Sequence, residues 1–327
     1  MVRYGWTFEL YATVCTSFVS LPKSPQRSSV KQPSTLLLSS TPSSNQTSDV
    51  ESDSLSHTVG SPEKYAAALG MTLEQVQIRK ELREESVREL QEQLEGTFDG
   101  KERHRLICQH RFKQGKHPFT CPKCWSYQPV CICGDAPGKK KTIPCEQVII
   151  WTHHSEWGSQ SNTGSVLPLV LENTRLLMKG LHDGNLESIL NADPTIQPVI
   201  LWPNVNFSNG NENYVTFDDL VGKKVILLAM EGTWRQARRM VSKFPYPRLS
   251  LTGGDSGSNN VPPPISILAP LRCQKDGPKH SVCTAEAVVM ALEGMGLDQD
   301  PSILELVKRK VDQTRRYRGK LNLGAKQ

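Results

Sequence analysis

Short apolar runs alternate with helix-like segments in the second half of the 327-residue chain, and this alternation limits the possible folds more than any other feature. Three of the four runs are almost continuously apolar, as is typical of parallel strands that are covered on both faces. The runs are 146–152, 198–202, 225–230 and 248–251, and the helix-like segments are about 166–179, 233–243, 284–294 and 301–317. The pattern predicts an α/β domain with a mainly parallel sheet and flanking helices.

Parallel sheets bind their ligands at the carboxyl ends of the strands. We therefore expect functional residues in the loops that follow Trp202 and Met230, and around Leu268–Arg272. The stretches 204–218 and 252–264 are rich in Asn, Gly and Pro and are predicted to be surface loops.

The first 60 residues are rich in Ser, Thr and Pro, and Glu9 is the only acidic residue before Asp49. This composition buries too little apolar surface to offset chain entropy. Two interpretations fit it: a disordered tail, or a transit peptide for a plastid or mitochondrion, so both cytoplasmic or nuclear and organellar locations stay open.

The rest of the chain divides into three further predicted regions. Residues 61–99 form a helical segment in which Thr72 is the N-cap and Gln75 holds the capping-box position, and which docks on the domain or on a partner. Residues 100–145 form a basic, cysteine-rich region, and 146–327 the α/β catalytic domain with a basic C-terminal helix.

Four of the nine cysteines lie within thirteen residues, in a CxxC pair followed by a CxC pair. Two close thiolate pairs suit tetrahedral Zn²⁺, so Cys121, Cys124, Cys131 and Cys133 predict a structural zinc knuckle. Free thiols in a reducing compartment are the alternative. A histidine could replace one ligand, and His117 is favoured over His104 and His110.

The formal net charge of +6 conceals an uneven distribution. Residues 100–145 carry +8 and residues 301–327 carry +6, whereas residues 146–300 carry −4. Two basic blocks are typical of a protein that binds a polyanion, although a solvated surface gives the same pattern. No apolar run reaches the roughly 18 residues that a membrane-spanning helix needs.

Three further motifs carry polar residues at expected strand or helix ends. They are Met230-Glu-Gly-Thr-Trp234 after a strand, Trp151-Thr-His-His-Ser-Glu156 after another, and Cys283-Thr-Ala-Glu-Ala287 at a helix start that Thr284 could cap. Taken singly, each is also an ordinary strand–turn–helix junction, a structural histidine pair or a helix cap.

Taken in order with the cysteine knuckle and the Leu201-Trp202-Pro203 turn, these motifs resemble those of the DTW-domain family over about residues 118–315. The family is that of the tRNA-uridine aminocarboxypropyltransferases, related to the SPOUT-like knotted α/β enzymes. The resemblance implies transfer of the 3-amino-3-carboxypropyl group from S-adenosylmethionine (SAM) to N3 of a tRNA uridine. The sequence departs from the family at Glu231, where the family has Asp, and at Cys283, where it has Ser.

The resemblance also implies roles for individual residues. Glu231 is the candidate general base, since a carboxylate can accept the N3 proton, with Glu286 and Glu156 as alternatives. Thr233 and Trp234 complete the catalytic set. The predicted donor-binding residues are Trp202, Pro203, Gly232, Leu268, Pro270, Arg272, Thr284 and Glu286, and the predicted tRNA contacts are Arg235, Arg238, Arg239, Lys308, Arg309, Arg315 and Arg316. An RNA methyltransferase and a noncatalytic zinc-ribbon RNA-binding protein are the alternative functions.

Overall fold

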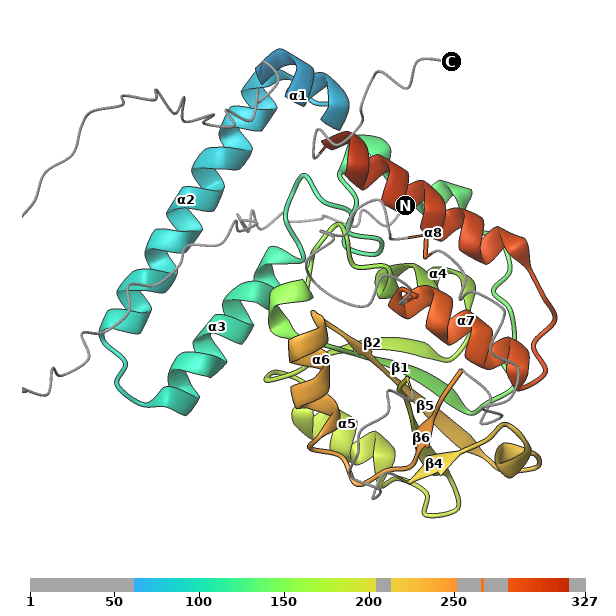
Figure 1. The fold of residues 1–327 in the computed structure, drawn as a ribbon. Coiled ribbons are helices and arrows are strands. Elements are labelled where there is room, and N and C mark those ends of the chain that lie inside the picture. Colours follow the sequence, from blue (N-terminus) through green and yellow to red (C-terminus); the bar gives the residue numbers. More distant parts are fainter. Residues whose placement is uncertain (1–61, 204–212, 252–265, 268–281, 318–327) are drawn as a thin grey trace, which may run out of the picture. The chain divides into compact units, whose positions relative to one another are not determined.

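The strands form one sheet in the order β2-β1-β5-β3-β6-β4 (Figure 1). The computed structural model describes residues 62–203, 213–251, 266–267 and 282–317. Every pairing between these strands is parallel, which confirms the predicted α/β sheet. The strands are β1 (Gln147–Thr152), β2 (Thr174–Met178), β3 (Gln197–Leu201), β4 (Tyr214–Val215), β5 (Val225–Glu231) and β6 (Arg248–Leu249).

Helices flank the sheet and precede it. They are α1 (Pro62–Leu69), α2 (Leu73–Glu95), α3 (Gly100–Gln114), α4 (Leu167–Val170), α5 (Asp183–Leu190), α6 (Trp234–Val241), α7 (Thr284–Gly294) and α8 (Pro301–Tyr317). The single turns used below are η2 (Cys133–Asp135), η3 (His154–Glu156) and η4 (Gly164–Val166).

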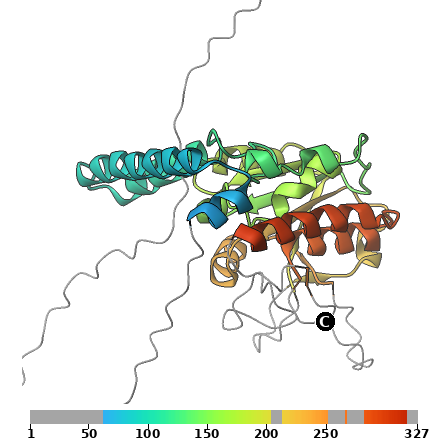
Figure 2. The same ribbon diagram turned by 90° about the horizontal axis from the view of Figure 1, so that it is seen from above.

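The central strand β5 has a different core on each side of the sheet, because successive side chains point to opposite faces. Val225, Leu227 and Ala229 belong to the core that includes α7, α8 and the cysteine region. Ile226 and Leu228 belong to the core built with α5 and α6. Figures 1 and 2 show α7 and α8 side by side on the first of these faces.

The connections that follow β1 and β5 lead to opposite sides of the sheet. Thr152, the last residue of β1, is in register with Glu231, the last residue of β5. From there the chain continues from β1 to β2 on one side of the sheet and from β5 to β6 on the other. Such a switch point leaves a crevice beyond the strand ends, which is where open parallel sheets bind ligands.

Two segments differ in secondary structure from the sequence expectation. The segment 166–179, expected to be one helix, contains the short α4 and then the edge strand Thr174–Met178, because a brief apolar run fits a strand and a buried helix equally well. The segment 204–218, expected to be a loop, contains strand β4 at Tyr214–Val215. The expected helix starts at 233 and 284 and the helix at 301–317 match α6, α7 and α8.

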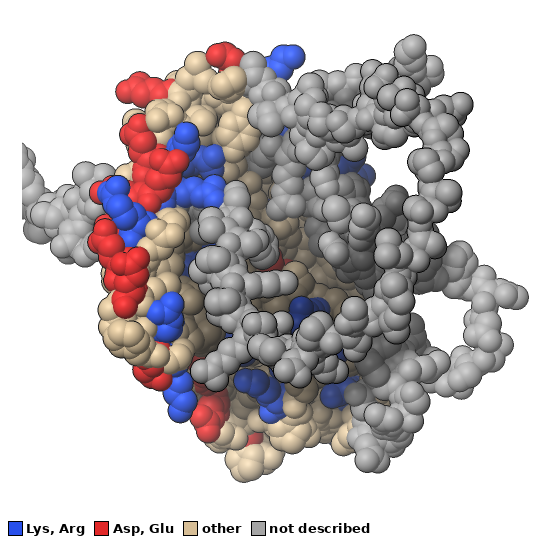
Figure 3. Space-filling model, turned by 60° about the vertical axis from the view of Figure 1, so that its left-hand side comes forward, with Lys and Arg blue, Asp and Glu red and all other residues tan. Residues whose placement is uncertain are grey.

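The predicted capping box of α2 is confirmed. The Thr72 hydroxyl accepts a hydrogen bond from the Gln75 amide, and the Gln75 side chain accepts one from the Thr72 amide. Arg79 of α2 donates to the hydroxyls of Tyr65 and Tyr127, which ties α2 to α1 and to the cysteine region. Figure 3 shows acidic and basic side chains interspersed over the described part of the face that it draws.

Several expectations fall outside the described residues: the nature of residues 1–60, the loop at 252–264, and the positions of Leu268, Pro270 and Arg272. The knot implied by the family resemblance stays a prediction. In the part of the chain that the structure describes, no helix combines the length and the apolar character that crossing a membrane requires.

Candidate active site and metal centre

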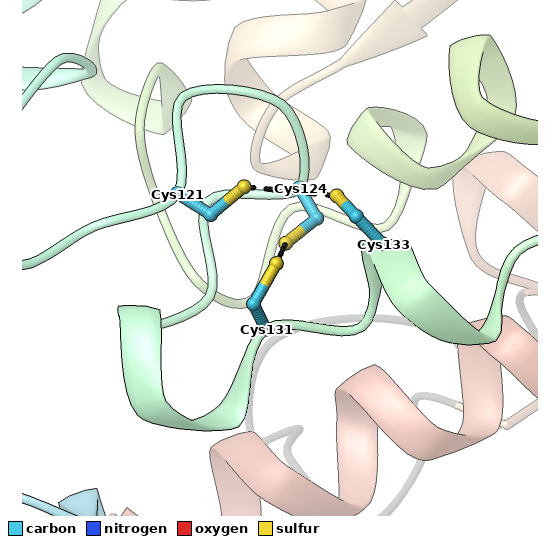
Figure 4. A group of neighbouring side chains, drawn as sticks. All are labelled: Cys121, Cys124, Cys131 and Cys133. Atoms are coloured by element: carbon cyan, nitrogen blue, oxygen red, sulfur yellow. Dashed lines mark hydrogen bonds between the residues drawn. The ribbon is translucent and has the colours of Figure 1, made fainter.

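The four predicted cysteine ligands converge (Figure 4). Their sulfur atoms all lie within 4.8 Å of one another, with 3.6 Å between Cys121 and Cys133 and 3.7 Å between Cys124 and Cys131. Zn–S bonds of about 2.3 Å in a tetrahedron put neighbouring sulfurs about 3.8 Å apart. The donor set and its spacing therefore fit Zn²⁺.

The backbone around the first cysteine pair forms a tight turn. The Cys121 amide donates to the Ser126 carbonyl (2.8 Å), and the Trp125 amide donates to the Cys121 carbonyl (2.9 Å). Trp125 has a φ of 60°, which is uncommon for a residue other than glycine. Its ring is buried against Trp157, with 5.0 Å between ring centroids, so packing holds the turn that presents Cys121 and Cys124.

No histidine joins this cluster among the residues that the structure describes. His117, the favoured substitute ligand, is buried, and its Nδ1 accepts a hydrogen bond from the Phe119 amide (3.1 Å). The candidate metal site thus consists of the four cysteines.

Glu231 ends β5 with its carboxyl group buried on the α7–α8 side of the sheet, and the residue is 8% exposed. Its Oε2 atom has no hydrogen-bond partner of normal geometry among the described residues. A Cβ atom added to Gly164, at the start of η4, would lie 3.1 Å from Oε2. The same Cβ atom would lie 2.9 Å from Cγ2 of Ile150, so a side chain at this position would displace its neighbours. The Oε2 atom is therefore closely surrounded, and it is buried without a hydrogen-bond partner.

Burial raises the pKa of Glu231 to about 7, and the nearby Glu156 carboxylate adds to the rise. The Thr284 hydroxyl, the Gly164 amide and the Lys310 ammonium act in the opposite direction and offset part of it. A carboxyl group with this pKa exchanges protons near neutral pH, as a general base requires.

The raised pKa of Glu231 has a measurable effect on stability. Its folded pKa of about 7 lies above the reference value of 4.5, so the folded state binds this proton more tightly than the unfolded state does. The stabilisation is present below pH 4.5 and lost as the pH rises through 7. As the pH rises from 4.5 to 7, the unfolding free energy of Glu231→Gln should therefore increase by about 3 kcal/mol relative to that of the wild type.

Urea unfolding of both proteins across this pH range measures the difference. Glu305→Gln, at an exposed position of α8, is the control, for which the difference from wild type should stay constant. If the difference in unfolding free energy between Glu231→Gln and wild type also stays constant with pH, the raised pKa of Glu231 is contradicted.

A hydrogen-bonded chain connects the loop after β1 to the helix after β5. His153 donates its amide to the Glu231 carbonyl (2.8 Å), and its ring Nδ1 lies 2.8 Å from the Ser155 hydroxyl. The Gln236 side-chain amide donates to the same hydroxyl (2.9 Å), and its oxygen accepts from the Thr233 amide (2.8 Å). The two motifs singled out in the sequence thus form one unit at the ends of β1 and β5.

The two histidines after β1 are neutral at physiological pH. Burial lowers the pKa of His153 to about 4 and that of His154 to about 3. Thr233, predicted as catalytic, is the N-cap of α6 and is exposed at the end of the strand.

The predicted aromatic residues lie on the other face of the sheet. Trp202 and Trp234 stack with 4.9 Å between ring centroids and 10° between planes, and both belong to the α5–α6 core. The guanidinium of Arg238 lies over the Trp234 ring, 5.6 Å from its centroid. The structure therefore separates the Glu231 carboxyl from this aromatic pair, although both lie near the carboxyl ends of the strands.

Glu286 serves mainly as an anchor. Its carboxylate accepts hydrogen bonds from the Ser266 hydroxyl (2.6 Å), the Ile267 amide (2.9 Å) and the Cys283 amide (2.7 Å). The N-cap of α7 is Cys283, so the expected capping role of Thr284 is wrong. Thr284 instead donates to the Met230 carbonyl (3.4 Å), which places its hydroxyl beside the end of β5.

Sequence reasoning missed Lys310, which is 1% exposed and interacts electrostatically with both the cysteine cluster and Glu231. Its ammonium group donates a hydrogen bond to the Cys124 carbonyl. Burial lowers the pKa of Lys310 to about 8, while Cys124 and Glu231 act in the opposite direction. The spacing of the residues in α8 could have indicated its burial. Lys310 lies on the same helix face as the buried residues Ile303, Val307 and Val311.

The predicted tRNA contacts divide between two faces. Arg235, Arg238 and Arg239 are exposed on α6, which covers one face of the sheet, and Lys308, Arg309 and Arg316 are exposed on α8, which covers the other, with Arg315 half-buried. Two of the α8 cations form ion pairs, Arg309 with Asp135 (3.1 Å) and Arg315 with Asp312 (3.5 Å).

A family model described as the DTW domain covers residues 118–314, from just before the first cysteine of the knuckle almost to the end of α8. No solved structure matches the chain. The matched region holds the four cysteines, the carboxyl ends of β1 and β5, and both helices that cover the Glu231 carboxyl. The chain therefore belongs to the DTW domain family, which is associated with tRNA-modifying enzymes.

Proposed function

We propose that this protein is a SAM-dependent tRNA-uridine aminocarboxypropyltransferase that forms 3-(3-amino-3-carboxypropyl)uridine. The observation that carries the proposal is the buried Glu231 carboxyl group, with an unpartnered oxygen at the end of the central strand of a DTW domain.

In the proposed reaction, Glu231 accepts the proton from uridine N3. The N3 lone pair then forms the new N–C bond, while the C–S bond of the donor breaks and its electron pair goes to sulfur, which leaves as methylthioadenosine. When bound, SAM supplies the electrophilic carbon next to its sulfonium. The pKa of Glu231, about 7, suits a base that must be deprotonated near neutral pH.

The donor is proposed to bind across the strand ends. Trp202 would give an apolar wall, and Pro203 is exposed and Gly232 partly exposed, a combination that suits adenosine. Thr284 adds a hydroxyl next to Met230, and Glu286 holds the segment that leads to Leu268, Pro270 and Arg272.

Zinc is proposed to have a structural role. The four cysteines fill a tetrahedral shell and leave no position for a substrate. The metal would therefore fix the turns that hold Cys124 and η2 against α8, and take no part in the transfer.

The tRNA is proposed to bind where the two basic regions of the sequence meet. Lys141 pairs with Asp300 at the start of α8 (3.0 Å), and Arg309 pairs with Asp135 further along it. Exposed cations on both segments can contact phosphates.

Reversing two exposed charges of α8, in Lys308→Glu/Arg316→Glu, is expected to weaken tRNA binding and to reduce the slope of log K against log salt by about two, because each lost phosphate contact removes about 0.9. Filter binding at several salt concentrations measures the slope. The matched control is Lys223→Glu/Lys224→Glu, whose exposed side chains precede β5 at the opposite end of the sheet. Equal slopes for the two double variants would contradict an α8 contact.

The activity itself is tested by incubating purified protein with SAM and tRNA, followed by mass spectrometry of the nucleosides. We expect the aminocarboxypropyl adduct of uridine. A methylated uridine without that adduct would identify an RNA methyltransferase instead. Tight tRNA binding with neither product would favour the noncatalytic zinc-ribbon alternative.

A further inference from the structure

A fully buried lysine is costly unless opposite charge compensates it. Lys310 is 1% exposed, and among the almost completely buried side chains of the described residues it is the largest. It occupies a position in the apolar stripe of α8, between Val307 and Val311, where a leucine or methionine would meet the requirements of packing.

The surroundings of Lys310 show what its charge faces. The ammonium donates to the carbonyl of Cys124, and the same carbonyl accepts a second hydrogen bond from the buried Ser165 hydroxyl (3.2 Å). Four groups would stabilise the ammonium when they are ionised, as the thiols would be when they bind a metal: Cys124, Glu231, Cys121 and Cys133.

The charge of the metal centre explains this arrangement. A zinc ion with four thiolate ligands carries a net charge of about −2. Cys121 and Cys124 are buried, so water compensates little of this charge. From this geometry we propose that Lys310 is a positioning residue of the metal knuckle, a buried cation that compensates the negative charge of the zinc–thiolate centre and holds it against α8.

Further contacts of α8 keep the ammonium in place. Arg309 pairs with Asp135 of η2 (3.1 Å), on the CxC side of the knuckle. One turn after Lys310, the buried Thr314 hydroxyl donates to the Gln160 carbonyl (3.1 Å), in the loop before η4. The helix thus contacts both halves of the knuckle and the loop that packs on Glu231, so the metal centre and the candidate active site share one support.

The test uses the zinc-loaded full-length protein and measures zinc transfer to a chromophoric chelator. Lys310→Met keeps the volume and removes the charge, and it is expected to weaken zinc binding by about 10- to 100-fold, as loss of partners around a metal site does. Lys310→Arg keeps the charge and should stay within about threefold of wild type. Lys308→Met, at an exposed position of the same helix, should bind zinc as the wild type does.

Circular dichroism at saturating zinc identifies variants that fail to fold. If Lys310→Met does not fold, Lys310→Arg decides the question: wild-type zinc affinity supports the proposal, and an affinity reduced tenfold or more contradicts it. A folded Lys310→Met with wild-type zinc affinity would also overturn it. Zinc affinity is measured independently of the proposed aminocarboxypropyl transfer. A negative result for Lys310 therefore leaves the proposed reaction untouched, and a negative result for the reaction leaves the proposal on Lys310 untouched.

Discussion

Glu231→Gln should lower the rate of aminocarboxypropyl transfer by about 10²- to 10⁴-fold, the usual contribution of a positioned general base. Glutamine keeps the shape of the side chain and its place beside Gly164, but it cannot accept the N3 proton. Because the carboxyl group is buried on the α7–α8 side, away from the exposed cations of α8, tRNA affinity should change by less than about twofold. Single-turnover assays with quantification of the modified nucleoside measure the chemical step.

Glu231→Asp is the matched control for this prediction. It restores the residue that the family has at this position, retains the charge, and withdraws the carboxyl group by about one methylene. We expect it to retain far more activity than Glu231→Gln. Wild-type rates in the glutamine variant would exclude Glu231 as the base. Glu156, whose charge interacts with Glu231, would then be the next candidate.

Loss of the metal centre should have the largest effect on stability. Cys124→Ser removes a ligand that is fully buried and whose carbonyl binds both Lys310 and Ser165. Structural zinc contributes about 10–16 kcal/mol in small domains, which is comparable to the whole stability of a typical protein. The variant is therefore expected to lose its zinc and to unfold at room temperature or at much lower denaturant concentrations than wild type.

Elemental analysis and thermal unfolding, each with and without chelator, measure this effect. Wild type should hold about one zinc ion per chain and lose stability when a chelator is added. Cys145→Ser changes a thiol outside the cluster and should leave both values unchanged. A Cys124→Ser protein with a full zinc content and an unchanged melting temperature would contradict the assignment of the ligands.

The features that the sequence predicted correctly depend on local patterns. Apolar runs identified β1, β3 and β5, and capping residues located the start of α2. The cysteine spacing identified all four members of the cluster, because ligands close together in the chain are close together in space. The motif after β5 placed Glu231 at a strand end for the same reason.

The features that it missed depend on distant parts of the chain. The strand at Thr174–Met178 is stabilised by pairing with β1, which no local pattern records. The contact of Lys310 with the cysteine turn depends on the packing of α8 against that turn. The separation of Glu231 from the Trp202–Trp234 pair follows from the alternation of β5 and β3 between two cores, whereas the sequence interpretation assigned all three residues to one site.

The central place of β5 also affects how the chain folds during synthesis. Its neighbours in the sheet, β1 and β3, are made first, and β5 must then pair with both. Until residue 231 has left the ribosome, two apolar strands that are buried in the finished protein lack their shared neighbour. Such late, long-range pairing slows folding and leaves strand edges exposed to other chains. In a nascent chain, the edges of β1 and β3 that pair with β5 in the finished sheet therefore stay unpaired until β5 has emerged.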